Sequence, residues 1–129
     1  VFGSGILHHL NLKKSVSEIS RILKNNGEMV FLEPLGTNPL INLYRKLTPK
    51  SRSEDEHPFL KKDFDFISSL FTNVTIKYYG FFTLIFFLFY KSPKKSLVFK
   101  IISRLDYYFL KIKYFKNFAW SVLIIAKKN

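Results

Sequence analysis

Two neighbouring histidines are the first residues in this sequence that could move a proton. His8 and His9 follow the short glycine-containing stretch Gly3-Ser4-Gly5. Histidine titrates near neutral pH and can take a proton from a nucleophile. Adjacent residues point in different directions, so at most one of the pair faces a common site. We expect His9 to be that general base; the other interpretation is that the histidines cap a helix or pack beside it.

Glu33 is the second candidate, because it stands at the end of an apolar segment. A carboxylate left unpaired at the end of a buried strand would be costly. We therefore expect Glu33 to bind a polar group of a substrate or to serve as a catalytic base. An equal alternative is that it caps backbone groups near Asn38.

A charged segment follows, from Arg52 to Pro58. Within it, Glu56 and His57 are candidates for contacts to a substrate, together with Asn38; a charged surface loop is the alternative interpretation. The three histidines of the chain do not follow a metal-ligand spacing, and the chain has no cysteine. We therefore expect no metal site.

The elements that must position these residues alternate between strand and helix. The chain starts like a strand, and apolar residues from Leu12 to Leu23 repeat with a helical period. Met29 to Leu32 are four consecutive apolar residues, which predicts a strand buried on both faces. Asn38-Pro39 predicts the start of a helix. Its expected inner face consists of Leu40, Ile41, Leu43, Tyr44 and Leu47.

The pattern of residues in the second half of the chain predicts a helix, two strands and an insertion. A helix from about Leu60 to Phe71 precedes an alternating strand at 72–79, and a last strand occupies 120–126. Between these strands, 81–117 form a helical insertion rich in aromatic and basic residues. The uncharged run at 78–90 is shorter than the roughly 20 residues that span a bilayer. We expect an α/β domain over the whole chain, with a mostly parallel sheet.

The net charge of +12 is concentrated in the second half. Residues 66–129 carry eleven Lys or Arg and a single acidic residue, Asp106, whereas residues 1–65 have a net charge of +2. Such asymmetry favours an anionic partner, although a lysine-rich composition bias is the other interpretation. Aromatic residues beside basic helices favour a membrane surface. A nucleic acid fits less well, because the aromatics cluster in one run instead of alternating with basic residues.

The order of several motifs resembles class I S-adenosylmethionine (SAM)-dependent methyltransferases of the methyltransferase type 11 kind. Phe2–Leu10 resembles the "G-x-x-L-H-H-L" turn after the fourth strand of that fold, and Ser17–Glu28 resembles the "E-x-x-R-v-L-k-p-G-G" that follows. Met29–Pro34 is similar to the fifth strand, often "f-x-E-P", and Arg52–Pro58 to a later "R-t-x-D-E-H-P". The last two strands resemble the antiparallel hairpin that ends the fold. The resemblance covers the whole chain and is most specific over residues 2–58.

The resemblance implies a Rossmann-like methyltransferase sheet and SAM as cofactor, held along Gly3, Ser4, Gly5 and His8. It also implies methyl transfer by in-line displacement to a small acceptor, which the aromatic run suggests is hydrophobic. The chain has no G-x-G-x-G turn followed by an acidic strand end, and it starts without Met. We interpret it as the C-terminal portion of one domain, with the N-terminal half missing and inactive alone.

The sequence also suggests an alternative function and a cellular location. The alternative function is a membrane-surface binding module without catalytic activity, suggested by the absent cofactor motif and the basic second half. No signal-peptide pattern is present at the N-terminus, so we expect a cytoplasmic location, peripheral at the membrane.

Overall fold

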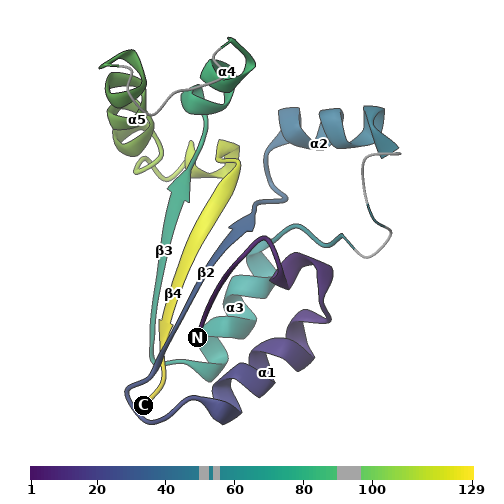
Figure 1. Cartoon of the computed structure of the whole chain (residues 1–129), viewed down its shortest axis with the longest axis vertical. Helices are drawn as coiled ribbons and strands as arrows, with labels where there is room; N and C mark the ends of the chain where they lie inside the picture. Colours follow the sequence, from purple (N-terminus) through teal and green to yellow (C-terminus); the bar gives the residue numbers. More distant parts are fainter. Residues whose placement is uncertain (50–52, 54–55, 90–96) are drawn as a thin grey trace.

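A four-stranded sheet organises the chain in the computed structural model, which describes residues 1–49, 53, 56–89 and 97–129; the side chains of 85 and 87–89 are not described (Figure 1). The elements are β1 (Phe2–Ser4), the 3-10 helix η1 (Leu7–His9), α1 (Leu12–Ile22), β2 (Glu28–Pro34), α2 (Pro39–Leu47), α3 (Lys61–Leu70), β3 (Asn73–Tyr79), α4 (Phe82–Phe89), α5 (Leu97–Phe109), the 3-10 helix η4 (Lys116–Phe118) and β4 (Ser121–Lys127).

The strands lie in the order β1-β2-β4-β3. β1 pairs with β2 in parallel, whereas β4 runs antiparallel to both of its neighbours. The predicted α/β sheet and its closing antiparallel pair are confirmed, and α4, α5 and η4 occupy the chain between those last two strands. The expected mostly parallel sheet is also present in the described strands: β1, β2 and β3 run in the same direction, and only β4, which lies between β2 and β3, is reversed.

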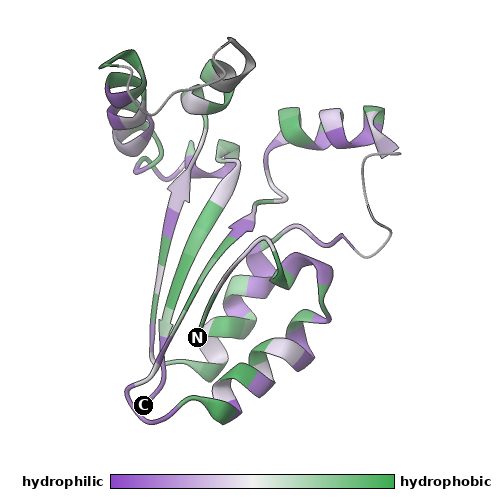
Figure 2. Ribbon diagram, viewed as in Figure 1, coloured by the Kyte–Doolittle hydropathy of each residue, from purple (hydrophilic) through white to green (hydrophobic). Residues whose placement is uncertain are grey.

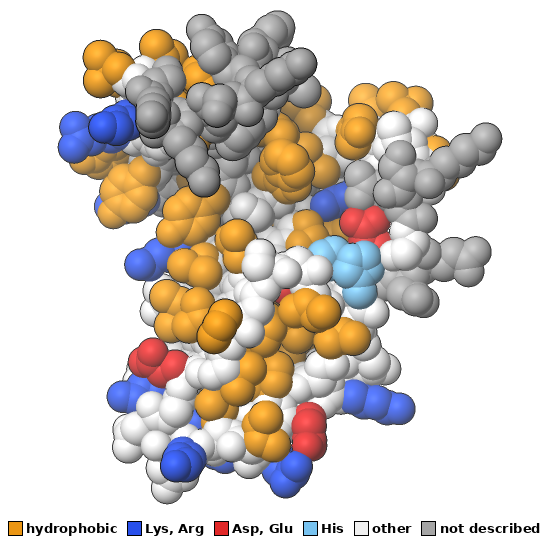
Figure 3. Space-filling view, viewed as in Figure 1, with side chains coloured by type: hydrophobic (Ala, Val, Ile, Leu, Met, Phe, Trp, Pro, Cys, Tyr) orange, Lys and Arg blue, Asp and Glu red, His pale blue; other side chains and the backbone are white. Residues whose placement is uncertain are grey.

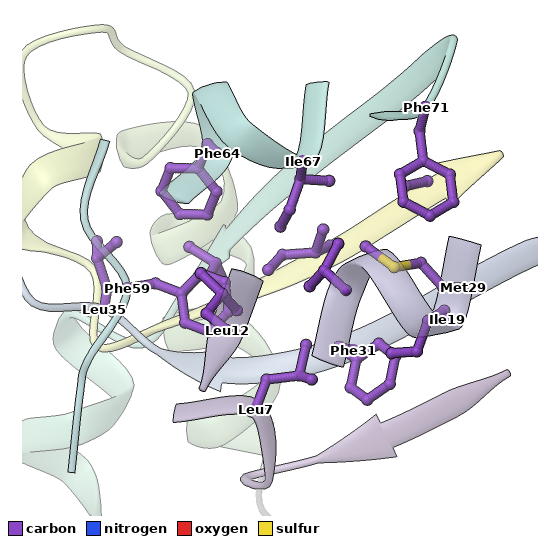
Figure 4. Packing of buried hydrophobic residues seen from close by; sticks show 14 of the residues in the cluster. Leu7, Leu12, Ile19, Met29, Phe31, Leu35, Phe59, Phe64, Ile67 and Phe71 are labelled. Carbon is purple, nitrogen blue, oxygen red and sulfur yellow. The ribbon is translucent and has the colours of Figure 1, made fainter. Parts of the chain in front are cut away.

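Helices α1 and α3 pack along one face of the sheet, and the core lies between them and the strands (Figure 1). Figure 4 shows the side chains that converge there, among them Leu7, Phe31, Phe64 and Ile67. Figure 2 shows that β4, which lies inside the sheet, is largely hydrophobic. Burial of this apolar surface is the main favourable contribution to folding.

β2 is buried on one face instead of two. Met29 and Phe31 are fully buried toward the helices, whereas Leu32 on the opposite face is 39% exposed. The prediction of burial on both faces is therefore wrong for the described residues. A run of apolar residues indicates that a strand is central in a sheet, but it does not show whether helices cover both faces.

α2 begins as predicted but packs differently. Asn38 caps it, with Pro39 in its first turn. Figure 1 shows α2 beyond the carboxyl end of β2 and away from the sheet. The predicted inner face is therefore not buried, and most of it is exposed: Leu40, Leu43, Tyr44 and Leu47.

Candidate functional site

The turn between β1 and η1 forms one wall of the candidate site. Gly5 has a φ of 61°, a left-handed conformation that glycine adopts without strain, and its N–H donates to the Leu32 carbonyl over 2.8 Å. A β-carbon on Gly3 would lie 2.6 Å from the Phe31 ring. The two glycines therefore let the end of β1 lie close against β2, with Ser4 between them.

Glu33 holds this turn from the neighbouring strand. Its Oε1 accepts hydrogen bonds from the N–H groups of Ile6 (3.1 Å) and Leu7 (2.9 Å). Its Oε2 accepts from the N–H of His8 (3.3 Å) and lies 2.7 Å from His8 Nδ1. The first N–H groups of a helix have no partner within the helix and favour a negative charge. Glu33, 1% exposed, therefore caps η1 and does not cap the backbone near Asn38.

His8 is oriented by this carboxylate. With Nδ1–H donated to Glu33, the second ring nitrogen, Nε2, is left as a hydrogen-bond acceptor. The His8 side chain is 9% exposed and lies in the wall of a pocket. His9 is exposed, and its ring contacts the His8 ring at a tilt of 42° with centroids 4.0 Å apart. His9 Nδ1 lies 3.1 Å from Ser53 Oγ. The structure thus brings His8, and not His9, to the pocket wall.

The pocket opens at the carboxyl ends of β1 and β2 and has a volume of about 660 Å³. In open α/β sheets ligands bind at this edge. Figure 3 shows histidine and acidic side chains together on one face, beside hydrophobic ones. The lining residues are Ser4, Gly5, His8, Leu32, Glu33, Pro34, Leu40, Ile41, Tyr44, Arg45, Glu56, Leu84, Trp120 and Ser121.

Two of the three expected substrate residues outside the strand end lie elsewhere. Asn38 is 1% exposed; its Oδ1 accepts from the N–H groups of Leu40 and Ile41, and its Nδ2 donates to the Phe118 carbonyl. It positions α2 beside the pocket instead of lining it. The His57 ring lies outside this pocket, with Nε2 3.1 Å from Asp63 Oδ2. Glu56 is the one that lines the pocket.

Sequence reasoning missed the far wall of the pocket. Leu84 and Trp120 reach it from α4 and from the residue before β4, and Arg45 reaches it from α2. Arg45 Nη1 donates to the Leu35 carbonyl (3.1 Å) and to Asn42 Oδ1 (2.9 Å). Trp120 is the single tryptophan of the chain, a signal that the composition already carried.

Two kinds of feature are absent from the part of the chain that the structure describes. Its His, Asp and Glu residues form no group of three that could hold a metal ion. None of its helices combines the length and apolar character needed to cross a bilayer.

The fold is shared with solved structures of methyltransferases. A SAM-dependent methyltransferase from Archaeoglobus fulgidus matches 99% of the chain with a TM-score of 0.56 and 20% identity. Phosphoethanolamine N-methyltransferase 2 from Haemonchus contortus, in complex with phosphomonomethylethanolamine and S-adenosylhomocysteine, matches 99% with a TM-score of 0.56 and 13% identity. The chain spans 58% of the first protein and 33% of the second. No family model and no curated protein sequence matches the chain.

Proposed function

We propose that this chain is the C-terminal part of a SAM-dependent methyltransferase that methylates a small acceptor in the pocket beside Glu33. The observation that carries the proposal is the position of this pocket. It lies at the carboxyl ends of two parallel strands, against a glycine turn, in a fold shared with methyltransferases.

The residues of the turn fit one end of the cofactor. Gly5 lines the pocket without a side chain, and Ser4 adds a hydroxyl beside it. These residues would lie against the methionine end of SAM, which when bound supplies an electrophilic methyl group on a sulfonium. A G-x-G-x-G turn and an acidic strand end are absent from the sequence. We therefore propose that the remaining contacts come from an N-terminal half of the same domain.

His8 is the residue with the geometry of a base. The acceptor's hydroxyl or amine loses a proton as it is methylated, and His8 Nε2 takes that proton. The carboxylate of Glu33, 2.7 Å from Nδ1, holds the ring in place and stabilises the imidazolium that forms. Glu33 is thus a positioning residue for His8. Because methyl transfer depends mainly on proximity and alignment, we expect the base to contribute less than the pocket itself.

The rest of the pocket favours an apolar acceptor. Apolar side chains supply much of its wall, among them Leu32, Leu40, Ile41, Leu84 and Trp120. Small-molecule sites are lined mainly by such side chains, with a few polar groups that fix orientation. The carboxylate of Glu56, which also lines the pocket, is one such group.

The test is calorimetric binding of SAM to this chain and to the chain extended upstream in its natural reading frame. We expect binding by the extended protein, weakened about tenfold or more by Gly5→Ala, because a methyl group would stand at the pocket edge. Asn26→Ala is the matched control: Asn26 also has a positive φ, 64°, but is exposed in the turn after α1 and lies outside this pocket. Absence of SAM binding by the extended protein would refute the proposal.

A membrane-surface role is the second candidate, and α5 favours it. Leu97, Ile101, Leu105 and Tyr108 are spaced along the helix and more than half exposed, and Lys100 and Arg104 flank them. An apolar stripe with basic flanks suits an anionic bilayer surface. Such contact would place the protein at the cytoplasmic side of a membrane.

Vesicle sedimentation tests this role. We expect the chain to sediment with vesicles containing phosphatidylserine and to be released by high salt. Ile101→Asp should abolish sedimentation, whereas Ser69→Asp on α3 should not. Equal sedimentation of both variants would refute a contact through α5.

A further inference from the structure

A second hollow lies on the other side of Trp120, between β3, α4 and α5. Its volume is about 480 Å³, within the roughly 300–1,000 Å³ of small-molecule sites. Figure 1 shows α4 and α5 beyond the carboxyl end of β3. The hollow is lined by Tyr78, Tyr79, Gly80, Thr83, Leu84, Phe99, Ser103, Asp106, Tyr107, Trp120 and Ser121. We call it the aromatic hollow.

The aromatic hollow adjoins the site pocket. Leu84, Trp120 and Ser121 line both spaces, so their side chains form the boundary between them. The Trp120 backbone is held in place there, because its N–H donates to the carbonyls of Tyr79 (3.0 Å) and Gly80 (2.9 Å). A β-carbon on Gly80 would lie 3.3 Å from the Trp120 β-carbon, so glycine lets the two segments approach closely.

The wall of the aromatic hollow offers little to a charged ligand. Asp106 is 4% exposed, and its carboxylate accepts hydrogen bonds from the N–H groups of Phe81, Phe82 and Thr83 and from Thr83 Oγ1. The carboxylate of Asp106 thus already has hydrogen-bond donors at the start of α4. Burial also raises the pKa of the Tyr78 hydroxyl, whereas Tyr79, Tyr107 and Trp120 in the same wall are exposed through their aromatic side chains. Hydrocarbon is the ligand chemistry that such a surface favours.

We propose that the aromatic hollow binds the apolar tail of an amphiphilic acceptor whose reactive group lies beside His8. A chain of carbon atoms would pass between Leu84 and Trp120, from one space into the other. The proposal rests on the proposed function for the identity of the ligand as acceptor. The binding of a tail can be tested without methyl transfer.

Trp120 supplies the signal for the test, because it is the single tryptophan. Straight-chain primary alcohols from hexanol to decanol are titrated into the chain while tryptophan fluorescence is recorded. We expect saturable changes, with affinity rising roughly fourfold for each added CH₂ that is buried. No change in fluorescence, or an affinity independent of chain length, would overturn the proposal.

A substitution that fills the aromatic hollow with a larger side chain tests where the alcohols bind. Ser103 on α5 lines the aromatic hollow and is absent from the wall of the site pocket. Ser103→Phe should remove the dependence on chain length, and Ser103→Leu, a smaller change, should weaken it if the phenylalanine variant does not fold. Ser17→Phe on the exposed side of α1 is the matched control and should bind as the unaltered chain does. Chain-length dependence that persists in both Ser103 variants would place the alcohols elsewhere, such as on the outer face of α5, and would overturn the proposal.

The two proposals fail separately. If the extended protein does not bind SAM but the alcohol series behaves as expected, the methyltransferase proposal is wrong and the aromatic hollow stands as a hydrocarbon site. If the extended protein binds SAM but the alcohols do not bind, the proposal of a hydrocarbon site in the aromatic hollow is wrong and the methyltransferase proposal stands.

Discussion

Two buried carboxylates, Glu33 and Asp106, form the same arrangement in two parts of the molecule. Each comes from an element more than 20 residues away in sequence and reaches the start of a helix, η1 for Glu33 and α4 for Asp106. Each accepts hydrogen bonds from three backbone N–H groups there. Both therefore satisfy donors that the helix itself leaves without partners.

The fourth partner distinguishes the two carboxylates. For Glu33 it is His8 Nδ1 at 2.7 Å, part of an imidazole ring whose second nitrogen can accept a proton. For Asp106 it is Thr83 Oγ1 at 2.5 Å, a hydroxyl that only donates in this contact. The same cap thus orients a candidate base at the site pocket in one place and anchors α4 over the aromatic hollow in the other.

Removal of the Glu33 carboxylate should have the largest effect. Glu33→Ala would leave three N–H groups and a histidine ring without their acceptor, so we expect the free energy of unfolding to fall by about 3–5 kcal/mol. Urea denaturation measures this change. Glu18→Ala is the control, because Glu18 forms an exposed pair with Arg21 on α1, and it should leave the midpoint almost unchanged. A small effect of Glu33→Ala would show that water replaces the cap.

Removal of the Asp106 carboxylate should cost somewhat less. α4 begins closer to solvent, with Phe82 36% exposed, so water can reach part of the freed backbone. We expect Asp106→Ala to lower the free energy of unfolding by about 2–3 kcal/mol in the same urea experiment. Asp65→Ala on the exposed side of α3 is the matched control. If Asp106→Ala lowers the free energy of unfolding as much as Glu33→Ala or more, the expected ranking of the two caps is wrong.

The Thr83 hydroxyl, which donates to Asp106, should contribute less to the free energy of unfolding than either carboxylate. Thr83→Val keeps the shape of the side chain but removes the donor to Asp106, and we expect a loss of about 1 kcal/mol. Thr83→Ser keeps the donor and should recover most of it. Thermal denaturation of the two variants side by side measures the difference, and identical melting temperatures would contradict a role for this hydrogen bond.

The histidine partner of Glu33 should matter least for stability and most for chemistry. His8→Asn keeps an N–H donor near Glu33, so we expect less than about 1 kcal/mol of lost stability. It removes the second ring nitrogen, so the rate of methyl transfer by the extended protein should lose the part of its pH dependence that a base contributes. His9→Asn is the control. A pH–rate profile altered only by His9→Asn would support the role first expected for His9.

Local patterns sufficed for several elements. The helical period between Leu12 and Leu23 predicts α1, and the alternation between residues 72 and 79 predicts β3. Ile22, the last residue of α1 and part of this apolar period, is 55% exposed because it lies at the helix end, past the edge of the packed face. Patterns of this kind succeed because helix and strand periods are properties of the backbone.

Contacts between distant segments could not be predicted in the same way. That Glu33 is buried and needs partners followed from its place after an apolar strand. That its partners are the N–H groups of η1 depends on the parallel pairing of β1 with β2, which no local period specifies. The junction at Leu84 and Trp120 likewise depends on two segments separated by the whole of α5.

The sequence by itself therefore determined the elements, their order and the residues whose side chains could take part in chemistry. These depend on side-chain type and local backbone preference. Only the tertiary structure decided that His8 faces the pocket, that α2 stands clear of the sheet, and that Trp120 lies between two hollows. Those outcomes depend on strand order and on which groups close packing leaves without hydrogen-bond partners. A change of strand order would alter all three while leaving every local pattern the same.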